Sequence, residues 1–362
     1  MEWLESVSSL PNLHPALVHF PIVLLVLAAG LDAGSVLVRR WASWNSLASA
    51  AYLLGAVSAW ATFFSGDHAA DELGMVPAAA QAALARHADL AWWLVALSTV
   101  VALAKAAQLS GIAAMAVTRR PAFKAASCVL GLGAVAMVGL TADRGGALVY
   151  RHGLAVSLSQ GPERAASAGA TPPETTESPV TIDEDGTLEW VPGAGSSLGG
   201  ALEWADPAMA SKARVVAGDR RPGALLEVHG RAVLLFSPDY GDLQAEWRVD
   251  LSEFEGQVAV VHHFVDTDSF ASFTLDTRSG KARLEQVEAG KVAVLDEQAF
   301  TPQEDDAAST LAVSSVGSHR KGFVNGDLVV HGHAAARSPG PAGLLLDGEG
   351  RVRILEAAMF PL

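Results

Sequence analysis

Four long apolar runs limit what this chain can fold into. Residues 16–38, 46–64, 89–110 and 122–142 consist largely of Ala, Leu, Val and Gly. Each run holds roughly 19 to 23 residues, which as a helix is long enough to cross a hydrocarbon core of about 30 Å. In lipid, a helix satisfies its backbone hydrogen bonds internally. The pattern therefore predicts a membrane α domain of four transmembrane helices over residues 1–155, in contact with membrane lipid.

Basic residues near the ends of the runs predict an orientation, because they favour the cytoplasmic side. The connections after the first and third runs carry Arg39, Arg40, Lys105, Arg119, Arg120 and Lys124. The opposite ends carry Arg86, Arg144 and Arg151. In a bacterial inner (cytoplasmic) membrane, the N-terminus and the segment after the fourth run are therefore expected on the periplasmic, extracytoplasmic side.

All the histidines of the membrane half stand at the ends that are predicted to face outward: His14, His19, His68, His87 and His152. Neutral imidazole binds iron, copper and zinc well, and ionisable residues at membrane depth are candidates for function. A b-type haem needs two axial histidines from different helices and no cysteine. Haem b at the outer mouth of the bundle is one prediction; the alternatives are a divalent metal or no cofactor.

Helix geometry ranks these histidines. His14 and His19 are five residues apart, so on a helix they point about 140° from each other and are not expected to bind one metal together. We predict His19 and His87 as the ligands of haem or metal, with His68 as the next candidate. Further cofactor contacts are expected from His14, His152, Arg144 and Arg151, the arginines pairing with propionates. Space for the macrocycle is expected at Gly55, Ala56, Gly131 and Gly133.

Carboxylates permit another site at the same mouth. Asp67, Asp71 and Glu72 stand beside His68, and Asp89 follows His87. Such a set suits zinc or copper, or a path for protons. Interfacial histidines also serve simply as caps or as side chains that reach toward water.

Asp32 is an isolated acid deep in the first run. Ionisable residues within membrane spans usually face the bundle interior. We expect it to bond with Ser58 or Trp60, or to take part in proton movement.

Four segments of the membrane half resemble a known family: NLHPALVHFPIVLLVLAAGLD, FFSGDHAADE, RHADLAWW and ADRGGALVYRHG. Through the HP-x-LVHFP and D-x-GG-x-LVY-x-HG elements, residues 10–155 are similar to the bacterial four-helix membrane family called domain of unknown function 2231. Some members are joined to Rieske or c-type cytochrome domains, so the resemblance implies redox surroundings and a redox protein complex as a partner. This chain carries no such domain.

Charge and cysteine content exclude several classes of protein. The chain has 25 Lys and Arg against 39 Asp and Glu, a net charge of −14, and the acidic excess lies after residue 152. Nucleic-acid binding needs cationic groups that neutralise phosphates, so no nucleic-acid partner is expected. Cys128 is the only cysteine, which excludes a disulfide within the chain, CxxCH haem attachment and cysteine-ligated iron–sulfur clusters.

The second half predicts a different architecture. Residues 156–181 are rich in Ala, Ser, Thr, Pro and Glu and are predicted to form a flexible linker. From 182 to 362, short alternating runs are separated by turn residues, which predicts about ten strands in an all-β sandwich. Asn325–Gly326 and Asp347–Gly348 are predicted as hairpin turns.

Three segments of this half resemble the laminin-G-like, or concanavalin-A-like, jelly-roll superfamily: LQAEWRVDLSEFEGQVAVVHHFVDTDSFASFTLD, GSHRKGFVNGDLVVHG and AGLLLDGEGRVRI. The resemblance covers about residues 200–362 and implies a jelly roll that binds a glycan or a protein. No Ser-His-Asp order, paired carboxylates on a recognisable frame or phosphate loop is present. We therefore do not expect an enzyme acting on its own.

Histidines also recur in the sandwich half, at His262, His263, His319, His331 and His333. Alternation along a strand puts His331 and His333 on one face, a spacing found in strand-borne metal sites. Solvent-facing polar residues have the same period, which is the simpler interpretation.

Two functions remain open from the sequence. One is a membrane-anchored accessory or electron-transfer subunit that binds b-type haem, with an extracytoplasmic sandwich for a partner. The other is a non-redox membrane-anchored protein whose sandwich recognises a glycan or a protein.

Overall fold

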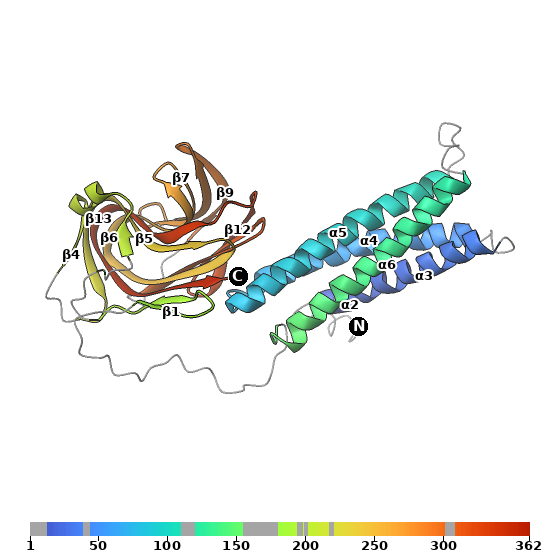
Figure 1. Ribbon diagram of the computed structural model, residues 1–362, viewed down its shortest axis with the longest axis horizontal. Coiled ribbons are helices and arrows are strands. Elements are labelled where there is room, and N and C mark those ends of the chain that lie inside the picture. The colour runs from blue at the N-terminus through green and yellow to red at the C-terminus, as the bar shows by residue number, and fades with distance from the viewer. Residues whose placement is uncertain are drawn as a thin grey trace, which may run out of the picture. The chain divides into compact units, whose positions relative to one another are not determined.

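The computed structural model describes residues 13–38, 44–109, 120–154, 180–193, 198, 202–216, 221–300 and 308–362. Most of the expected linker, and the basic residues Arg39, Arg40 and Arg119, lie outside the described residues. The chain divides into two compact units, one made of helices and one made of strands (Figure 1).

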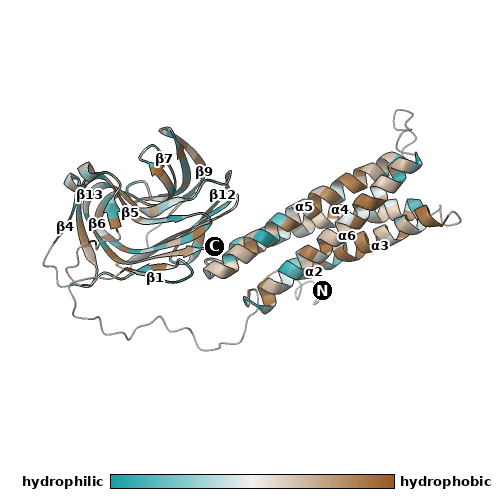
Figure 2. Ribbon diagram, viewed as in Figure 1, coloured by the Kyte–Doolittle hydropathy of each residue, from teal (hydrophilic) through white to brown (hydrophobic). Residues whose placement is uncertain are grey.

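The described helices of the first unit are α2 (His14–Leu17), α3 (His19–Leu37), α4 (Trp44–Glu72), α5 (Ala78–Leu109) and α6 (Pro121–Tyr150). With α2 and α3 taken together, they form four segments long and apolar enough to span a membrane. Hydrophobic residues dominate along them (Figure 2). Large apolar side chains such as Phe20, Val57 and Leu103 face outward, as a lipid environment favours. The predicted four membrane helices are confirmed.

The first membrane segment is interrupted at Val18, between α2 and α3. Pro21 has no amide hydrogen, so the carbonyl of Leu17 lacks the main-chain bond that a helix normally supplies from residue i+4. Thr62 of α4 donates its Oγ1–H to that carbonyl at 3.2 Å. The proline therefore frees an acceptor that ties α2 to α4.

Three helices run further than their apolar runs. α4 continues to Glu72, α5 begins at Ala78 and α6 continues to Tyr150, because polar residues do not stop a helix that no longer faces lipid. The 29 residues of α4 span about 44 Å, more than the hydrocarbon core of about 30 Å. His68, His87 and Arg144 consequently lie on helices rather than in the loops.

The second unit is an antiparallel β-sandwich. Its described strands are β1 (Val180–Ile182), β2 (Leu188–Trp190), β3 (Leu202–Trp204), β4 (Ala213–Val215), β5 (Ala224–Tyr240), β6 (Leu243–Asp266), β7 (Ser269–Asp276), β8 (Lys281–Glu288), β9 (Lys291–Ala299), β10 (Ser309–Val316), β11 (His319–Val324), β12 (Asp327–His333) and β13 (Gly340–Pro361), with a 3₁₀ helix, η3 (Pro207–Ser211). One path of pairing runs β1-β2-β13-β6-β10-β11-β12, and the other runs from β3 and β4 through β5, β13, β6 and β7 to β8 and β9.

Three long strands, β5, β6 and β13, pass through both layers of the sandwich. A line of glycines crosses them, because Gly348 of β13 pairs with Gly230 on one side and Gly256 on the other. Gly230 and Gly256 have φ values of 114° and 153°, which side chains disfavour. The strands can bend sharply here, so Asp347–Gly348 lies inside a strand and its prediction as a hairpin turn is wrong.

The core lies between the two layers. Phe236 of one layer packs against Trp247 and Trp190 of the other, with ring centroids 5.5 and 6.4 Å apart. All three side chains are fully buried. The predicted all-β sandwich is confirmed. So is the Asn325–Gly326 turn, where φ values of 52° and 89° match the positive φ that such hairpins require.

Candidate cofactor site in the helical bundle

His14 is held against α4 through its Nδ1. This atom lies 3.1 Å from the carbonyl oxygen of Thr62 and 3.2 Å from Oγ of Ser65. A carbonyl can only accept, so Nδ1 donates to Thr62, and the neutral ring then carries its lone pair on Nε2. The ring rests on Gly66, where an added Cβ would lie 2.7 Å from Cε1 of His14. Glycine is what permits this close approach.

His87 of α5 is held against α6 in the same manner. Its Nδ1 lies 3.1 Å from the carbonyl oxygen of Thr141, which again assigns the proton to Nδ1 and the lone pair of the neutral ring to Nε2. The ring rests on Gly145, where an added Cβ would lie 3.0 Å from Cε1 of His87. In both cases the glycine follows the threonine by four residues, one helical turn.

The two imidazoles lie toward the same end of the bundle, His14 at the start of the first membrane segment and His87 in the first part of α5. They come from different membrane segments. A main-chain carbonyl of α4 orients His14, and a main-chain carbonyl of α6 orients His87. The arrangement offers two imidazoles whose orientation is fixed, and such imidazoles could hold a metal ion or a haem iron.

The other predicted ligands do not join this pair. His19 is exposed on the outside of α3, because α2 presents His14, five residues earlier, toward α4. On the first membrane segment His14, and not His19, is therefore the histidine that contacts a neighbouring helix. His68 is also exposed, and its Nε2 lies 3.2 Å from Oε1 of Glu72 on the same helix. His152 is half-buried just after α6.

The two predicted propionate partners lie at the same end of the bundle. Arg144 is exposed on α6 and directly precedes Gly145, the residue against which His87 packs. Arg151 is exposed at the C-terminal cap of α6.

The expected slot at the bundle glycines is filled by side chains. Leu25 occupies the space beside Gly55, where an added Cβ would lie 2.8 Å from its Cδ2. The hydroxyl of Tyr52 lies directly over Gly131. These glycines let α3, α4 and α6 pack closely, and they do not leave room for a macrocycle.

A buried ion pair lies near the opposite end of the bundle. Lys105 of α5 donates from Nζ to Oδ1 of Asp32 of α3, and both side chains are fully buried. Lys105 thus lies inside the bundle, and its assignment to a cytoplasmic connection is wrong. The expected partners of Asp32 bond elsewhere: Trp60 donates to Thr99 Oγ1 at 3.1 Å, and Ser58 donates to its own helix. The attraction of an intramembrane acid for the nearest base explains the difference.

In the sandwich, His262 and His263 form a buried pair. Their side chains are 1% and 2% exposed, and their Nδ1 atoms lie 2.6 Å apart. Burial, together with the nearby charges of Arg320 and Arg337, lowers the pKa of His263 to about 4 and holds that of His262 well below its usual value. Both imidazoles are therefore neutral near pH 7 and part of the core.

A polar network covers one face of β7, β8 and β9. Glu297 accepts from Lys281 Nζ and from Arg283 Nε, each at 2.5 Å, and Thr274 donates to Glu285 at 3.0 Å. Hydrogen bonds from Lys281 and Arg283 hold the pKa of Glu297 below its usual range. The network presents oriented carboxylates and a guanidinium on one sheet face.

The comparison with protein families bears on the bundle. Residues 10–158 match the family described as "Predicted membrane protein (DUF2231)". The helical unit is thus similar to the DUF2231 family. Its extent agrees with the resemblance over residues 10–155, and the DUF2231 description supports a membrane protein. The comparison with curated proteins gave no match.

Three solved structures resemble part of the chain outside the DUF2231 match. The carbohydrate binding module CBM66 from Bacillus subtilis is 15% identical, with a TM-score of 0.36, over 44% of this chain and 95% of that chain. A Bacillus subtilis protein of unknown function with a galectin-like fold is 10% identical, with a TM-score of 0.35, over 44% of this chain and 87% of that chain. The VIP36 exoplasmic/lumenal domain, in a Ca2+/Man3GlcNAc-bound form, is 9% identical, with a TM-score of 0.37, over 50% of this chain and 90% of that chain. The sandwich architecture itself follows from the strand pairing.

Sequence reasoning missed the partners of the bundle histidines. Thr62 and Gly66 on one helix, and Thr141 and Gly145 on another, repeat the spacing Thr-x-x-x-Gly. That repeat, near the same end of the bundle on both helices, is the signal that identifies His14 and His87 rather than His19 as the inward pair.

Proposed function

We propose that the helical unit binds a b-type haem between His14 and His87, and that the protein is a membrane-anchored electron-transfer or accessory subunit. The observation that carries the proposal is the repeated arrangement in which each imidazole donates its Nδ1–H to a threonine carbonyl and rests on the glycine one turn later.

The chemistry of this arrangement suits haem iron. A hydrogen bond from Nδ1 to a carbonyl orients the ring and makes Nε2 a better electron donor to a metal. His14 and His87 would hold the haem iron, and no cysteine would be needed. Arg144 and Arg151, exposed at the same end, are the cationic groups available to the propionates.

The proposed location is a bacterial cytoplasmic membrane, with the histidine end and the sandwich on the periplasmic side. The basic residues near the opposite end support this orientation even without Lys105. The acidic sandwich half favours a basic redox protein as the partner, because complementary charge speeds encounter.

Haem content of the full chain tests the proposal. Purified in detergent, the protein is expected to give a Soret band and a sharp α band after reduction with dithionite. His14→Ala and His87→Ala each remove an axial ligand and should abolish the low-spin spectrum. His19→Ala is the matched control, since His19 is exposed on the outside of α3, and it should retain the spectrum.

Two results would overturn this function. One is the absence of haem and of iron from wild-type protein expressed in haem-replete cells. The other is an unchanged spectrum in His14→Ala and His87→Ala. Zinc or copper in place of iron at the bundle would favour the alternative of a histidine and carboxylate metal site.

A second candidate function belongs to the sandwich: recognition of a glycan. The polar network on β7–β9 favours it, because fixed carboxylates and a guanidinium can hydrogen-bond to sugar hydroxyls. A glycan array with the wild type and Arg283→Ala tests this. Arg214→Ala is the control, since Arg214 also pairs with a glutamate, Glu227, on exposed strands. Binding that is equal in both variants, or absent from the wild type, would refute it.

A further inference from the structure

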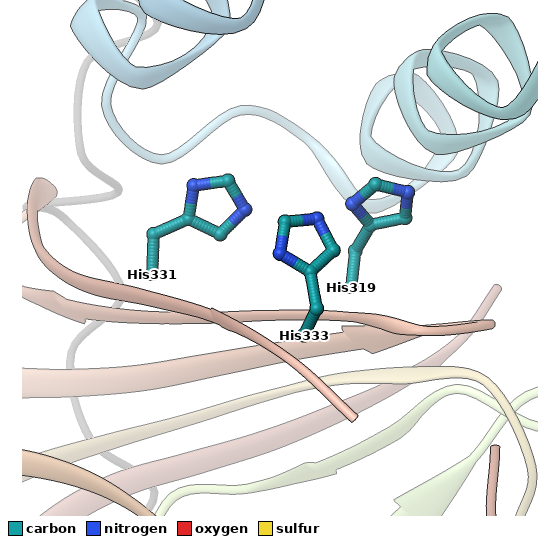
Figure 3. A group of neighbouring side chains, drawn as sticks. All are labelled: His319, His331 and His333. Carbon is teal, nitrogen blue, oxygen red and sulfur yellow. The ribbon is translucent and has the colours of Figure 1, made fainter. Parts of the chain in front are cut away.

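Three imidazoles gather on one face of the β11–β12 hairpin. His319 opens β11, and His331 and His333 lie near the end of β12. His319 pairs directly with His333, and Lys321 pairs with His331. Directly opposed residues in an antiparallel pair share a face, and so do residues two apart on one strand. All three rings therefore stand on the same side of the hairpin (Figure 3).

The rings are close enough to share one ion. The ring centroid of His333 lies 4.8 Å from that of His319 and 5.0 Å from that of His331. One ring nitrogen of each histidine can be chosen so that the three lie within 4.8 Å of one another. Zinc–nitrogen bonds of about 2.0–2.1 Å in a tetrahedral site require nitrogens roughly 3.3 Å apart. Small rotations of the three histidine side chains, which are unbranched at Cβ, can bring the nitrogens to that separation.

The strands beneath the rings are fixed from the other side. Gly332, between the two histidines of β12, packs against Leu295 of β9, where an added Cβ would lie 2.9 Å from Cβ of Leu295. The main-chain N–H of His331, on the edge strand, donates to Oδ2 of Asp296 at 3.0 Å. The Asn325–Gly326 turn sets the register of the hairpin. The histidines are thus carried by a rigid frame, which lowers the entropic cost of binding an ion.

We propose that His319, His331 and His333 bind a late first-row divalent cation, with Zn²⁺ as the reference ion. Imidazole nitrogen suits zinc, copper and nickel, whereas calcium and magnesium prefer oxygen ligands. Three protein ligands leave a fourth position for water or an outside donor, as in open zinc sites. His333 is exposed, so an ion can enter from solution. This site is independent of the haem proposed for the bundle.

The charge next to the site limits its affinity. Lys321 opposes His331 on the same face of the hairpin, and an ammonium repels a dication. With three neutral ligands and this neighbour, the site is expected to bind zinc reversibly rather than to hold it as a condition of folding.

Zinc binding by the full chain in detergent tests the site. After treatment with a chelator, the wild type is expected to take up zinc by equilibrium dialysis, and His319→Ala, His331→Ala and His333→Ala should each weaken binding by about ten-fold or more. His229→Ala is the matched control, because His229 is an exposed histidine of the same sandwich that pairs with Glu349. It should bind zinc as the wild type does.

A second measurement keeps the test independent of folding and of the bundle. Cu²⁺ bound to the wild type should give an electron paramagnetic resonance spectrum with splitting from several imidazole nitrogens, also when His14 and His87 are replaced by alanine. Loss of this splitting in the triple variant of the hairpin, with unchanged circular dichroism, would support the site. The proposal is overturned if the wild type takes up no zinc, or if the triple variant binds zinc as tightly as the wild type.

Discussion

The helical bundle and the β-sandwich differ in the side chains that they carry on their outer surfaces. The bundle carries apolar side chains on its outside and places Asp32, Lys105 and its two oriented imidazoles against neighbouring helices. The sandwich packs tryptophan and phenylalanine inside and carries its hairpin histidines on an outer strand face. The solvent decides the difference: lipid favours polar groups that pair within the protein, whereas water accepts them at the surface.

This contrast divides the candidate sites by chemistry. A haem held between helices would be retained by its iron ligands and by apolar contacts. An ion held by three imidazoles on a sheet face can exchange with solution. The two histidine sets are therefore expected to take different partners in one chain.

The largest effect is expected from breaking the ion pair inside the bundle. Lys105→Met leaves Asp32 as an unpaired buried charge and should lower the free energy of unfolding by about 3–5 kcal/mol. The matched change in the sandwich, Arg214→Met, removes an exposed pair with Glu227 and should cost less than about 1 kcal/mol. Thermal and denaturant unfolding in detergent measure both. Equal losses of stability in Lys105→Met and Arg214→Met would contradict the difference between the two units. Adding Asp32→Leu to Lys105→Met removes the unpaired charge and should recover stability.

Acid is expected to act on the buried histidine pair of the sandwich. The pKa of His263 is about 4 in the folded chain and about 6.5 when unfolded. The two states bind protons equally above that range, and as the pH falls from about 6.5 to about 4 the unfolded state gains a proton first. Stability should fall over this window by roughly 2–3 kcal/mol.

His263→Asn isolates this contribution from that of carboxylates. Asparagine tolerates the positive φ of 49° at this position and does not titrate. Unfolding of the variant between pH 7 and pH 4 should depend less steeply on pH than that of the wild type. An identical slope would contradict a neutral buried imidazole.

A smaller effect is expected from closing the space beside an inward histidine. Gly66→Ala places a Cβ against His14 and should weaken haem retention by about ten-fold, or about 1.4 kcal/mol. Gly30→Ala is the control, because an added Cβ at Gly30 meets no atom within 4 Å. The fraction of haem that each purified variant retains on dilution measures this effect. Equal haem retention in Gly66→Ala and Gly30→Ala would show that Gly66 does not contribute to the haem site.

Local patterns predicted the elements well because they depend on local physics. Apolar runs fixed the four membrane helices, and alternation with turn residues identified the sandwich and the Asn325–Gly326 hairpin. The end of α4 was placed too early and the start of α5 too late, because Gly74 follows the end at Glu72 and Pro77 precedes the start at Ala78, and the limits of the apolar runs do not set these boundaries. The turn assigned to Gly348 failed because bending at a line of glycines needs three paired strands.

The site was harder to predict because it depends on how helices rotate about their axes. The histidine positions pointed to one end of the bundle, yet the choice between His14 and His19 depends on Thr62, forty-eight residues after His14. Lys105 was counted with the basic residues of the connection after the third run, and only its partner Asp32 explains its burial. By contrast, strand alternation alone put His331 and His333 on one face, and pairing added His319.

Iron and zinc measured together in one preparation test the division into two histidine sites most directly. After equilibration with zinc, the wild-type chain should carry about one haem iron and about one hairpin zinc. His87→Ala should lose the iron and keep the hairpin zinc, and His331→Ala should keep the iron and lose that zinc. A wild type without iron, or variants that lose both metals together, would contradict the account.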